Sequence, residues 1–218
     1  MINETQGKVF SATGDNTPVA GCTVSKAIAT GDGYSISHFL LADKTDISAE
    51  IYRYPKLILM LDGMAEVYSK DNMAAILHAG EAVITPTEVP VGVGTETGAI
   101  YTEIVMEKEF SMNTQKEGMV FQLKDVIPYQ EGKIVNKDII NDDHLKLVVM
   151  SFAKDTGLAE HAAPGDALLF ALDGSAVVTY EGIDHRIQAG ENFKFAKNGR
   201  HAIKADENFK MALLLTID

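Results

Sequence analysis

The sequence is poor in the residues that mark secreted, disulfide-rich or membrane-spanning proteins. It has one cysteine, Cys22, no tryptophan and six prolines in 218 residues. A lone cysteine cannot form an internal disulfide, which favours a reducing compartment. No apolar run approaches the roughly 20 residues of a membrane-spanning helix, and the N-terminus has neither the basic start nor the apolar core of a signal peptide. We therefore expect a cytoplasmic protein with no membrane partner.

Positive charge is also scarce. The chain has 19 Lys and Arg residues against 31 Asp and Glu residues, which gives a formal net charge of −12 at pH 7. An acidic surface repels a phosphate backbone, and no helix-turn-helix pattern is present, so the sequence argues against a nucleic-acid partner. The acids are spread along the chain rather than gathered in a tail, which favours a role in solubility.

The sequence does contain a series of short apolar runs. Those at 36–41, 145–152 and 168–172 have the length of strands, are rich in Val, Ile, Leu and Phe, and end near turn residues such as Gly, Asp and Asn. This pattern is typical of β-sandwiches and barrels. One segment, 72–77, has helical propensity, but its counterpart later in the chain is the arm of a hairpin, so we predict a strand there as well. The predicted fold class is all-β.

The same signals occur twice at a nearly constant spacing. Gly-Lys-Val-Phe at 7–10 recurs as Gly-Met-Val-Phe at 118–121, an offset of 118 − 7 = 111. Ala-Gly-Glu at 79–81 recurs at 189–191, an offset of 189 − 79 = 110. A spacing that is maintained over the whole length indicates internal duplication.

The duplication predicts two tandem barrels that divide the chain near its middle. We place the N-terminal barrel at residues 1–111 and the C-terminal barrel at residues 112–218. Two barrels in one chain already imitate a dimer of single barrels, so the expected assembly is a monomer or a homodimer.

Two motifs in the second half place histidines at strand ends. The first contains His161 and closes at Gly174, and Ala163 lies two residues after the histidine. The second opens at Gly190 and reaches His201, forty positions after His161 (201 − 161 = 40). Together these motifs resemble those of the cupins, a superfamily of RmlC-like jelly-roll barrels. In the first cupin motif the position of Ala163 is a second histidine and the position of Ala167 is a glutamate.

The resemblance implies a degenerate metal site in the C-terminal barrel. Three histidines and a glutamate hold a divalent metal in cupins, and His161 and His201 match two of them. Asp166 lies next to the lost glutamate position and is a candidate third ligand for Fe, Mn, Ni or Zn, although strand alternation would turn its neighbour inward instead. Without a metal, the two histidines are candidates for direct ligand binding.

The first repeat has lost these histidines. The offset of 111 maps His161 to Glu50, and the same offset maps Ala163 to Tyr52. No metal is expected in the N-terminal barrel, where Glu50 and Tyr52 are instead candidates for ligand binding. A carboxyl group in an apolar barrel would have a raised pKa unless it is paired. The competing interpretation is that this barrel is a scaffold or a dimerisation domain.

Three classes of function are compatible with these patterns. The first is a binding protein that holds a small polar or anionic metabolite in the C-terminal barrel. The second is a metal-dependent cupin enzyme, of the isomerase, dioxygenase or decarboxylase type, acting on a small organic acid or sugar derivative. The third is a structural role, in which large apolar side chains such as Phe193 and Phe195 fill both barrels. Fold alone does not decide whether the chain is an enzyme.

Overall fold

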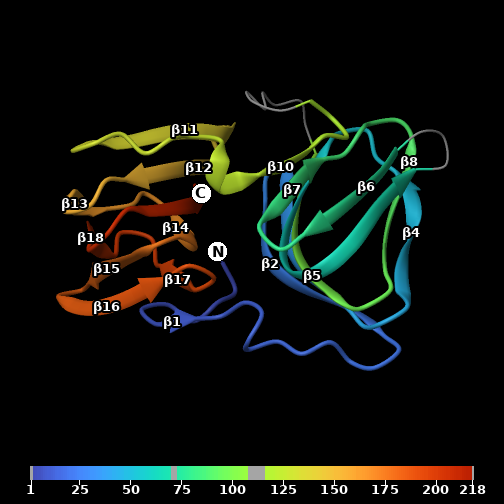
Figure 1. Ribbon diagram of the computed structural model, residues 1–218, viewed down its shortest axis with the longest axis horizontal. Helices are drawn as coiled ribbons and strands as arrows, with labels where there is room; N and C mark the ends of the chain where they lie inside the picture. The colour runs from blue at the N-terminus through green and yellow to red at the C-terminus, as the bar shows by residue number, and fades with distance from the viewer. Residues whose placement is uncertain (1, 70–72, 108–115, 218) are drawn as a thin grey trace. The chain divides into compact units, whose positions relative to one another are not determined.

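The structure is a computed structural model that describes residues 2–69, 73–107 and 116–217 (Figure 1). These ranges are built from β-strands, and their one helical segment is a short 3₁₀ turn, η1 (Leu123–Asp125). No helix within them is long and apolar enough to cross a membrane. The prediction of an all-β fold is confirmed. The chain divides into two compact units.

The N-terminal unit contains the described residues from Thr13 to 107 and from 116 to Gln122. Its strands follow the order β10-β7-β5-β9-β3-β2, and the long strand β5 also pairs with β6 and β8, which extends to β4. All pairs are antiparallel. The strands are β2 (Thr23–Gly31), β3 (Tyr34–Leu41), β4 (Thr45–Ile51), β5 (Lys56–Ser69), β6 (Met73–His78), β7 (Glu81–Ile84), β8 (Pro90–Thr95), β9 (Ala99–Met106) and β10 (Val120–Gln122).

The C-terminal unit contains the described residues up to Ala12 and from Leu123 onward. One sheet has the order β1-β17-β14-β19-β12-β11 and the other the order β13-β18-β15-β16. The strands are β1 (Val9–Phe10), β11 (Ile134–Asn141), β12 (Leu145–Phe152), β13 (Gly157–Ala162), β14 (Asp166–Asp173), β15 (Ser175–Tyr180), β16 (Ile183–Gln188), β17 (Asn192–Phe195), β18 (Arg200–Ala205) and β19 (Phe209–Thr216).

The two units pair their strands in the same order. The β3–β9 and β4–β8 pairs of the N-terminal unit correspond to β12–β19 and β13–β18 of the C-terminal unit. Strand β5 corresponds to β14 and β15 together, which separate at Gly174. Gly63 and Gly174 both adopt positive φ, at 73° and 70°. A Cβ atom there would lie 2.3 Å and 1.9 Å from the carbonyl oxygens of Gly98 and Asn208, so each position requires glycine.

Each unit takes an outer strand from the other half of the sequence. Strand β1 pairs with β17 in the C-terminal unit, and β10 pairs with β7 in the N-terminal unit. These two strands lie in the two copies of the Gly-x-Val-Phe repeat. The units therefore divide the chain differently from a single cut between residues 111 and 112, a boundary that itself lies outside the described residues.

Asp166 anchors the N-terminal segment in the C-terminal unit. Its carboxylate accepts hydrogen bonds from the backbone N–H groups of Ile2 and Lys197, both at 2.9 Å, and pairs with the Lys194 ammonium at 3.6 Å. The Lys194 ammonium also donates to the carbonyl oxygen of Ile2. Asp166 is 9% exposed, yet these donors outweigh desolvation and hold the pKa of its carboxyl below its usual value.

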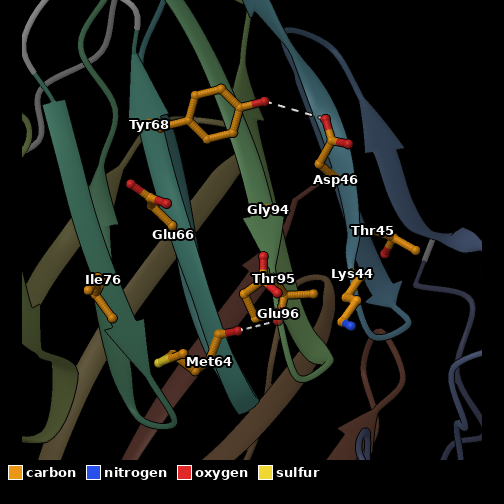
Figure 2. A pocket seen from close by; sticks show the side chains of 10 residues that line it. All are labelled: Lys44, Thr45, Asp46, Met64, Glu66, Tyr68, Ile76, Gly94, Thr95 and Glu96. Carbon is orange, nitrogen blue, oxygen red and sulfur yellow. Dashed lines mark hydrogen bonds between the residues drawn. The ribbon is translucent and has the colours of Figure 1, made fainter.

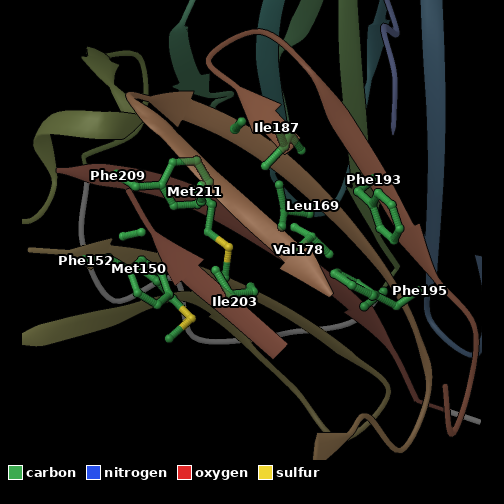
Figure 3. Packing of buried hydrophobic residues seen from close by; sticks show 14 of the residues in the cluster. Met150, Phe152, Leu169, Val178, Ile187, Phe193, Phe195, Ile203, Phe209 and Met211 are labelled. Carbon is green, nitrogen blue, oxygen red and sulfur yellow. The ribbon is translucent and has the colours of Figure 1, made fainter. Parts of the chain in front are cut away.

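The interior of the C-terminal unit is filled by apolar and aromatic side chains. Its core cluster contains 15 buried residues. Figure 3 shows side chains of this cluster, among them Leu169, Phe193 and Phe195. Phe193, Phe195 and Phe209 are all 0% exposed. The corresponding cluster of the N-terminal unit has 12 buried residues, of which Tyr101 is the one aromatic member. The two barrels therefore differ most in the aromatic content of their interiors.

Asp166→Asn is expected to loosen the N-terminal segment and lower the free energy of unfolding by about 2 kcal/mol, because two buried charge-assisted hydrogen bonds weaken. The depressed pKa means that this stabilisation is present above the unfolded-state pKa of about 3.9 and is lost as the pH falls through the folded-state value. Urea unfolding from pH 6 to pH 2 measures both effects, with exposed Asp138→Asn as control. An unchanged pH dependence would contradict the assignment.

His38 is expected to make the protein acid-sensitive at a higher pH. The side chain is 1% exposed on β3 and its Nδ1 lies 3.0 Å from the Thr102 hydroxyl. Burial, assisted by Lys26, lowers the His38 pKa to about 4. Because the unfolded state binds the proton first, stability is fully present above about pH 6.5 and falls by on the order of 3 kcal/mol toward pH 4. His38→Gln should flatten this fall, whereas exposed His78→Gln should leave it unchanged.

Candidate functional site

The interior of the N-terminal barrel contains a polar pocket of about 220 Å³. Its apolar walls come from β3, β4, β5 and β8, and its polar groups lie on or next to β4, β5, β7 and β9. The polar residues that carry the argument below are Glu50, Tyr52, Lys56, Thr85, Tyr101 and Glu103. Glu50 is exposed, and the pocket therefore opens to solvent on its side.

Strand register explains why this barrel has space at a position where the C-terminal barrel has an aromatic ring. In the C-terminal unit Ala167 pairs with Phe195, whose ring lies in the core cluster. The corresponding neighbours in the N-terminal unit are Lys56 and Thr85, with offsets of 167 − 56 = 111 and 195 − 85 = 110. Here the backbone N–H of Lys56 donates to the Thr85 hydroxyl at 2.9 Å. A threonine in place of a phenyl ring leaves the volume that the lysine side chain and the pocket occupy.

A buried ion pair forms the polar centre of the pocket. The Lys56 ammonium lies 3.2 Å from Oε2 of Glu103, and each residue is 8% exposed. Burial raises the pKa of the Glu103 carboxyl above its usual value, and the charge and hydrogen bond of Lys56 partly offset that rise. Two charges removed from water in this way cost free energy that only their pairing recovers.

Tyr52 contacts both the Lys56 ammonium and Glu50, which lies at the solvent-exposed rim of the pocket. Its hydroxyl donates to Oε2 of Glu50 at 2.7 Å, and the Lys56 ammonium lies 3.4 Å from the centre of its ring. The second contact has the geometry of a cation–π interaction. Burial and the carboxylate of Glu50 both raise the pKa of the Tyr52 hydroxyl, which therefore stays protonated. The structure thus brings together Glu50 and Tyr52, the two residues predicted for this barrel.

Tyr101 has a buried hydroxyl group that is available for hydrogen bonding. Its ring stacks on Phe39, with ring centres 5.1 Å apart, and the residue is 0% exposed. The hydroxyl has no hydrogen-bond partner among the described residues. Burial raises its pKa, so it is a neutral donor and acceptor. An unpaired buried hydroxyl costs free energy, which a ligand able to hydrogen-bond with it would recover.

His161 and His201 are paired across β13 and β18, so the structure brings together the two residues predicted for the C-terminal barrel. Their ring centres are 4.3 Å apart, and His201 also stacks on Phe195 at 4.3 Å. Each Nδ1 lies 2.9 Å from a backbone carbonyl oxygen two residues earlier, that of Ala159 or Gly199, and must donate its proton. Both Nε2 atoms are therefore left as acceptors. His161 is exposed, whereas burial lowers the pKa of His201, which is 3% exposed.

The residues around these histidines do not complete a cupin metal set. Asp166 holds the N-terminal segment, and Ala163 and Ala167 have no donor atoms. In the described part of the chain, no group of three or more His, Cys, Asp or Glu side chains is placed to hold a metal ion. In the N-terminal barrel the position of the cupin glutamate is Lys56, whose positive charge repels a cation. Neither barrel therefore fits the full ligand set that the resemblance implies.

A second hollow, of about 460 Å³, lies over the outer face of β4, β5, β6 and β8 (Figure 2). Its floor is Gly94, and the Tyr68 hydroxyl reaches across to Asp46 at 3.4 Å. A Cβ atom on Gly92 would lie 2.5 Å from the Tyr68 ring and 2.9 Å from the carbonyl oxygen of Ile47, so a larger residue there would displace one of them. The carboxylates of Asp46, Glu66 and Glu96 are exposed, so this hollow lacks the desolvated polar groups of the barrel pocket.

Sequence reasoning missed Lys56, Thr85, Tyr101 and Glu103. One signal could have found two of them. Lys56 begins a continuous apolar run, and Glu103 interrupts another, 99–106. Charged residues are almost never fully buried unless paired. A lysine and a glutamate of opposite charge in two neighbouring buried strands therefore predict an internal ion pair.

Comparison with known proteins supports the fold. No family model and no curated protein matches the chain. Among solved structures, a cupin 2 conserved barrel domain protein from Leptotrichia buccalis is 28% identical, with 99% of both chains covered and a TM-score of 0.87. A putative glyoxylate-induced protein from Pseudomonas aeruginosa is 14% identical over 89% of this chain and 80% of its own, with a TM-score of 0.61.

A third structure is more distant in sequence. Salicylate 1,2-dioxygenase from Pseudoaminobacter salicylatoxidans is 9% identical over 96% of this chain and 80% of its own, with a TM-score of 0.66. The structural neighbours include cupin-domain proteins, and the chain has the cupin fold. The expectation drawn from the two histidine motifs is confirmed at that level.

Lys56→Met is expected to lower the free energy of unfolding by about 3 kcal/mol at pH 7, because it leaves the Glu103 carboxylate buried without its partner. The double variant Lys56→Met, Glu103→Leu should recover most of that loss, since no buried charge remains. Exposed Lys204→Met is the control. Equal losses for the single and double variants would show that Glu103 does not depend on Lys56.

Proposed function

We propose that the protein binds a small, polar, uncharged molecule in the pocket of the N-terminal barrel, without the help of a metal. The observation that carries this proposal is that Tyr101 lines the pocket while its buried hydroxyl has no partner in the described ranges. Native structures rarely leave such a group unsatisfied. A bound ligand that hydrogen-bonds with it would remove the cost.

The charges of the pocket favour an uncharged ligand. Lys56 is already neutralised by Glu103, and Glu50 adds a second carboxylate at the rim. An anionic ligand would meet two carboxylates and only one ammonium, so its own desolvation would not be offset. Phe39, Ile47 and Val91 supply apolar contact area around these polar groups. Concave sites of this kind, mostly apolar with a few placed polar groups, are typical of small-molecule binding.

We propose further that the two barrels arose by duplication and then specialised. The shared pairing order and the two offsets support a common origin. In this view the C-terminal barrel became a filled core, while the N-terminal barrel lost its aromatic filling and retained a site at the positions of the motif. Binding would then reside in the N-terminal barrel, not in the C-terminal barrel as the histidine motifs suggested.

A second candidate function rests on the His161–His201 pair. Both Nδ1 atoms donate to backbone carbonyls, and such a hydrogen bond is what fixes the ring of a metal-binding histidine with its Nε2 toward the metal. This supports a cupin enzyme that uses Fe, Mn, Ni or Zn in the C-terminal barrel. The missing carboxylate and the filled interior weigh against it, and we rank it below the N-terminal pocket.

The two candidates are separated by ligand-induced stabilisation. Thermal unfolding is measured with cyclohexanol, glycerol, acetate and imidazole as probes. We expect cyclohexanol, which is uncharged and has one hydroxyl on an apolar ring, to raise the melting temperature of the wild type more than acetate does. A bound ligand stabilises the folded state in proportion to the logarithm of its concentration over its dissociation constant.

Two variants decide between the candidates: one fills the pocket of the N-terminal barrel, and the other removes the histidine pair of the C-terminal barrel. Thr85→Phe restores the ring that the C-terminal barrel has at this register position, and it should abolish the stabilisation by cyclohexanol. His161→Ala with His201→Ala should leave the stabilisation intact. If the histidine variant loses it and the Thr85 variant keeps it, the site is in the C-terminal barrel and the proposal is wrong.

A further inference from the structure

The pocket holds a primary amine beside a carboxyl group that can exchange a proton with it. The Lys56 ammonium lies 3.2 Å from Oε2 of Glu103 and lines the pocket, although only a tenth of its side chain is exposed. A lysine held among apolar groups is a common nucleophile toward carbonyl compounds. Lys194, which is also buried and ion-paired, belongs to the N-terminal anchor and lines neither pocket described above.

Building on the proposed binding site, we infer that its ligands are small neutral aldehydes or ketones and that the Lys56 amine condenses with them reversibly to form an imine. Three features of the geometry support this. Lys56 provides the nucleophile, and Glu103 lies within hydrogen-bonding distance of it. Tyr101 lines the same pocket, and its hydroxyl, which has no partner among the described residues, is a candidate donor to a carbonyl oxygen there.

Lys56, Glu103 and the carbonyl compound alone account for every proton transferred when the imine forms. The Lys56 ammonium gives one proton to Glu103, and the neutral amine then adds to the carbonyl carbon. The new C–N bond forms as the C–O π bond breaks, and a proton moves from nitrogen to that oxygen to give a carbinolamine. Glu103 returns its proton as the hydroxyl leaves, so the products are a protonated imine and one water molecule. No oxidant or reductant takes part.

The environment of Glu103 suits this proton transfer. Burial raises the pKa of its carboxyl, which brings the group closer to accepting a proton near neutrality. Tyr52 and Phe39 line the same pocket, and the side chains of Lys56 and Glu103 are only 10% and 11% exposed, so bulk water has little access to the reacting atoms. Hydrolysis of the imine is slowed where water is excluded.

The inference is tested by trapping the imine in the full-length protein. The wild type is incubated with cyclohexanone and sodium cyanoborohydride, and the alkylated lysines are located by peptide mass spectrometry. We expect Lys56 to be alkylated in preference to Lys194, which is equally buried, and ahead of the exposed Lys204. Lys56→Arg should lose this labelling, and Glu103→Gln should slow it.

Cyclohexanol separates this inference from the proposed function, because it has the shape of cyclohexanone but no carbonyl group. If both compounds stabilise the wild type but Lys56 is not alkylated in preference to Lys194, the imine inference is wrong and the binding site stands. If neither compound stabilises the wild type and Lys56 stays unlabelled, both are wrong. Preferential labelling of Lys56 in the wild type supports the inference without any variant having to fold.

Discussion

The volume inside each barrel is the constraint on which the rest of the structure depends. The rings of Phe193, Phe195 and Phe209 are buried in the core of the C-terminal barrel. At the equivalent register positions the N-terminal barrel has smaller side chains, with Thr85 in place of Phe195. Protein interiors are close-packed, so the missing rings must be replaced by something. The Lys56–Glu103 ion pair occupies part of that space, and the rest is the pocket beside it.

A buried ion pair is a poor source of stability compared with an apolar core of the same volume. Its presence at the centre of a barrel therefore points to a role other than packing. The pair lies beside the unpaired hydroxyl of Tyr101 and behind the rim formed by Glu50 and Tyr52, which is the arrangement expected of a site that accepts a ligand. In the C-terminal barrel, by contrast, the buried carboxylate of Asp166 has a structural role, because it holds the N-terminal segment.

The sequence was sufficient for the fold but only for part of the site. Alternation and repeat offsets predicted strands even at 72–77, where β6 (Met73–His78) forms despite helical propensity because its hairpin partner β5 imposes pairing. The motifs placed His161 and His201 in one barrel, where the structure pairs them across β13 and β18. Charges in two apolar strands could have indicated that Lys56 and Glu103 are buried, but that they lie beside a pocket depends on the register of β5 against β9 and on the small side chain of Thr85. The role of Asp166 depends on where the N-terminal segment docks, which no local pattern encodes.

The most direct measurement is a crystal structure of the protein soaked with cyclohexanol. The proposal predicts ligand density inside the N-terminal barrel, with its hydroxyl within hydrogen-bonding distance of the Tyr101 oxygen. Density beside His161 and His201 instead, with the N-terminal pocket filled by protein side chains, would contradict it.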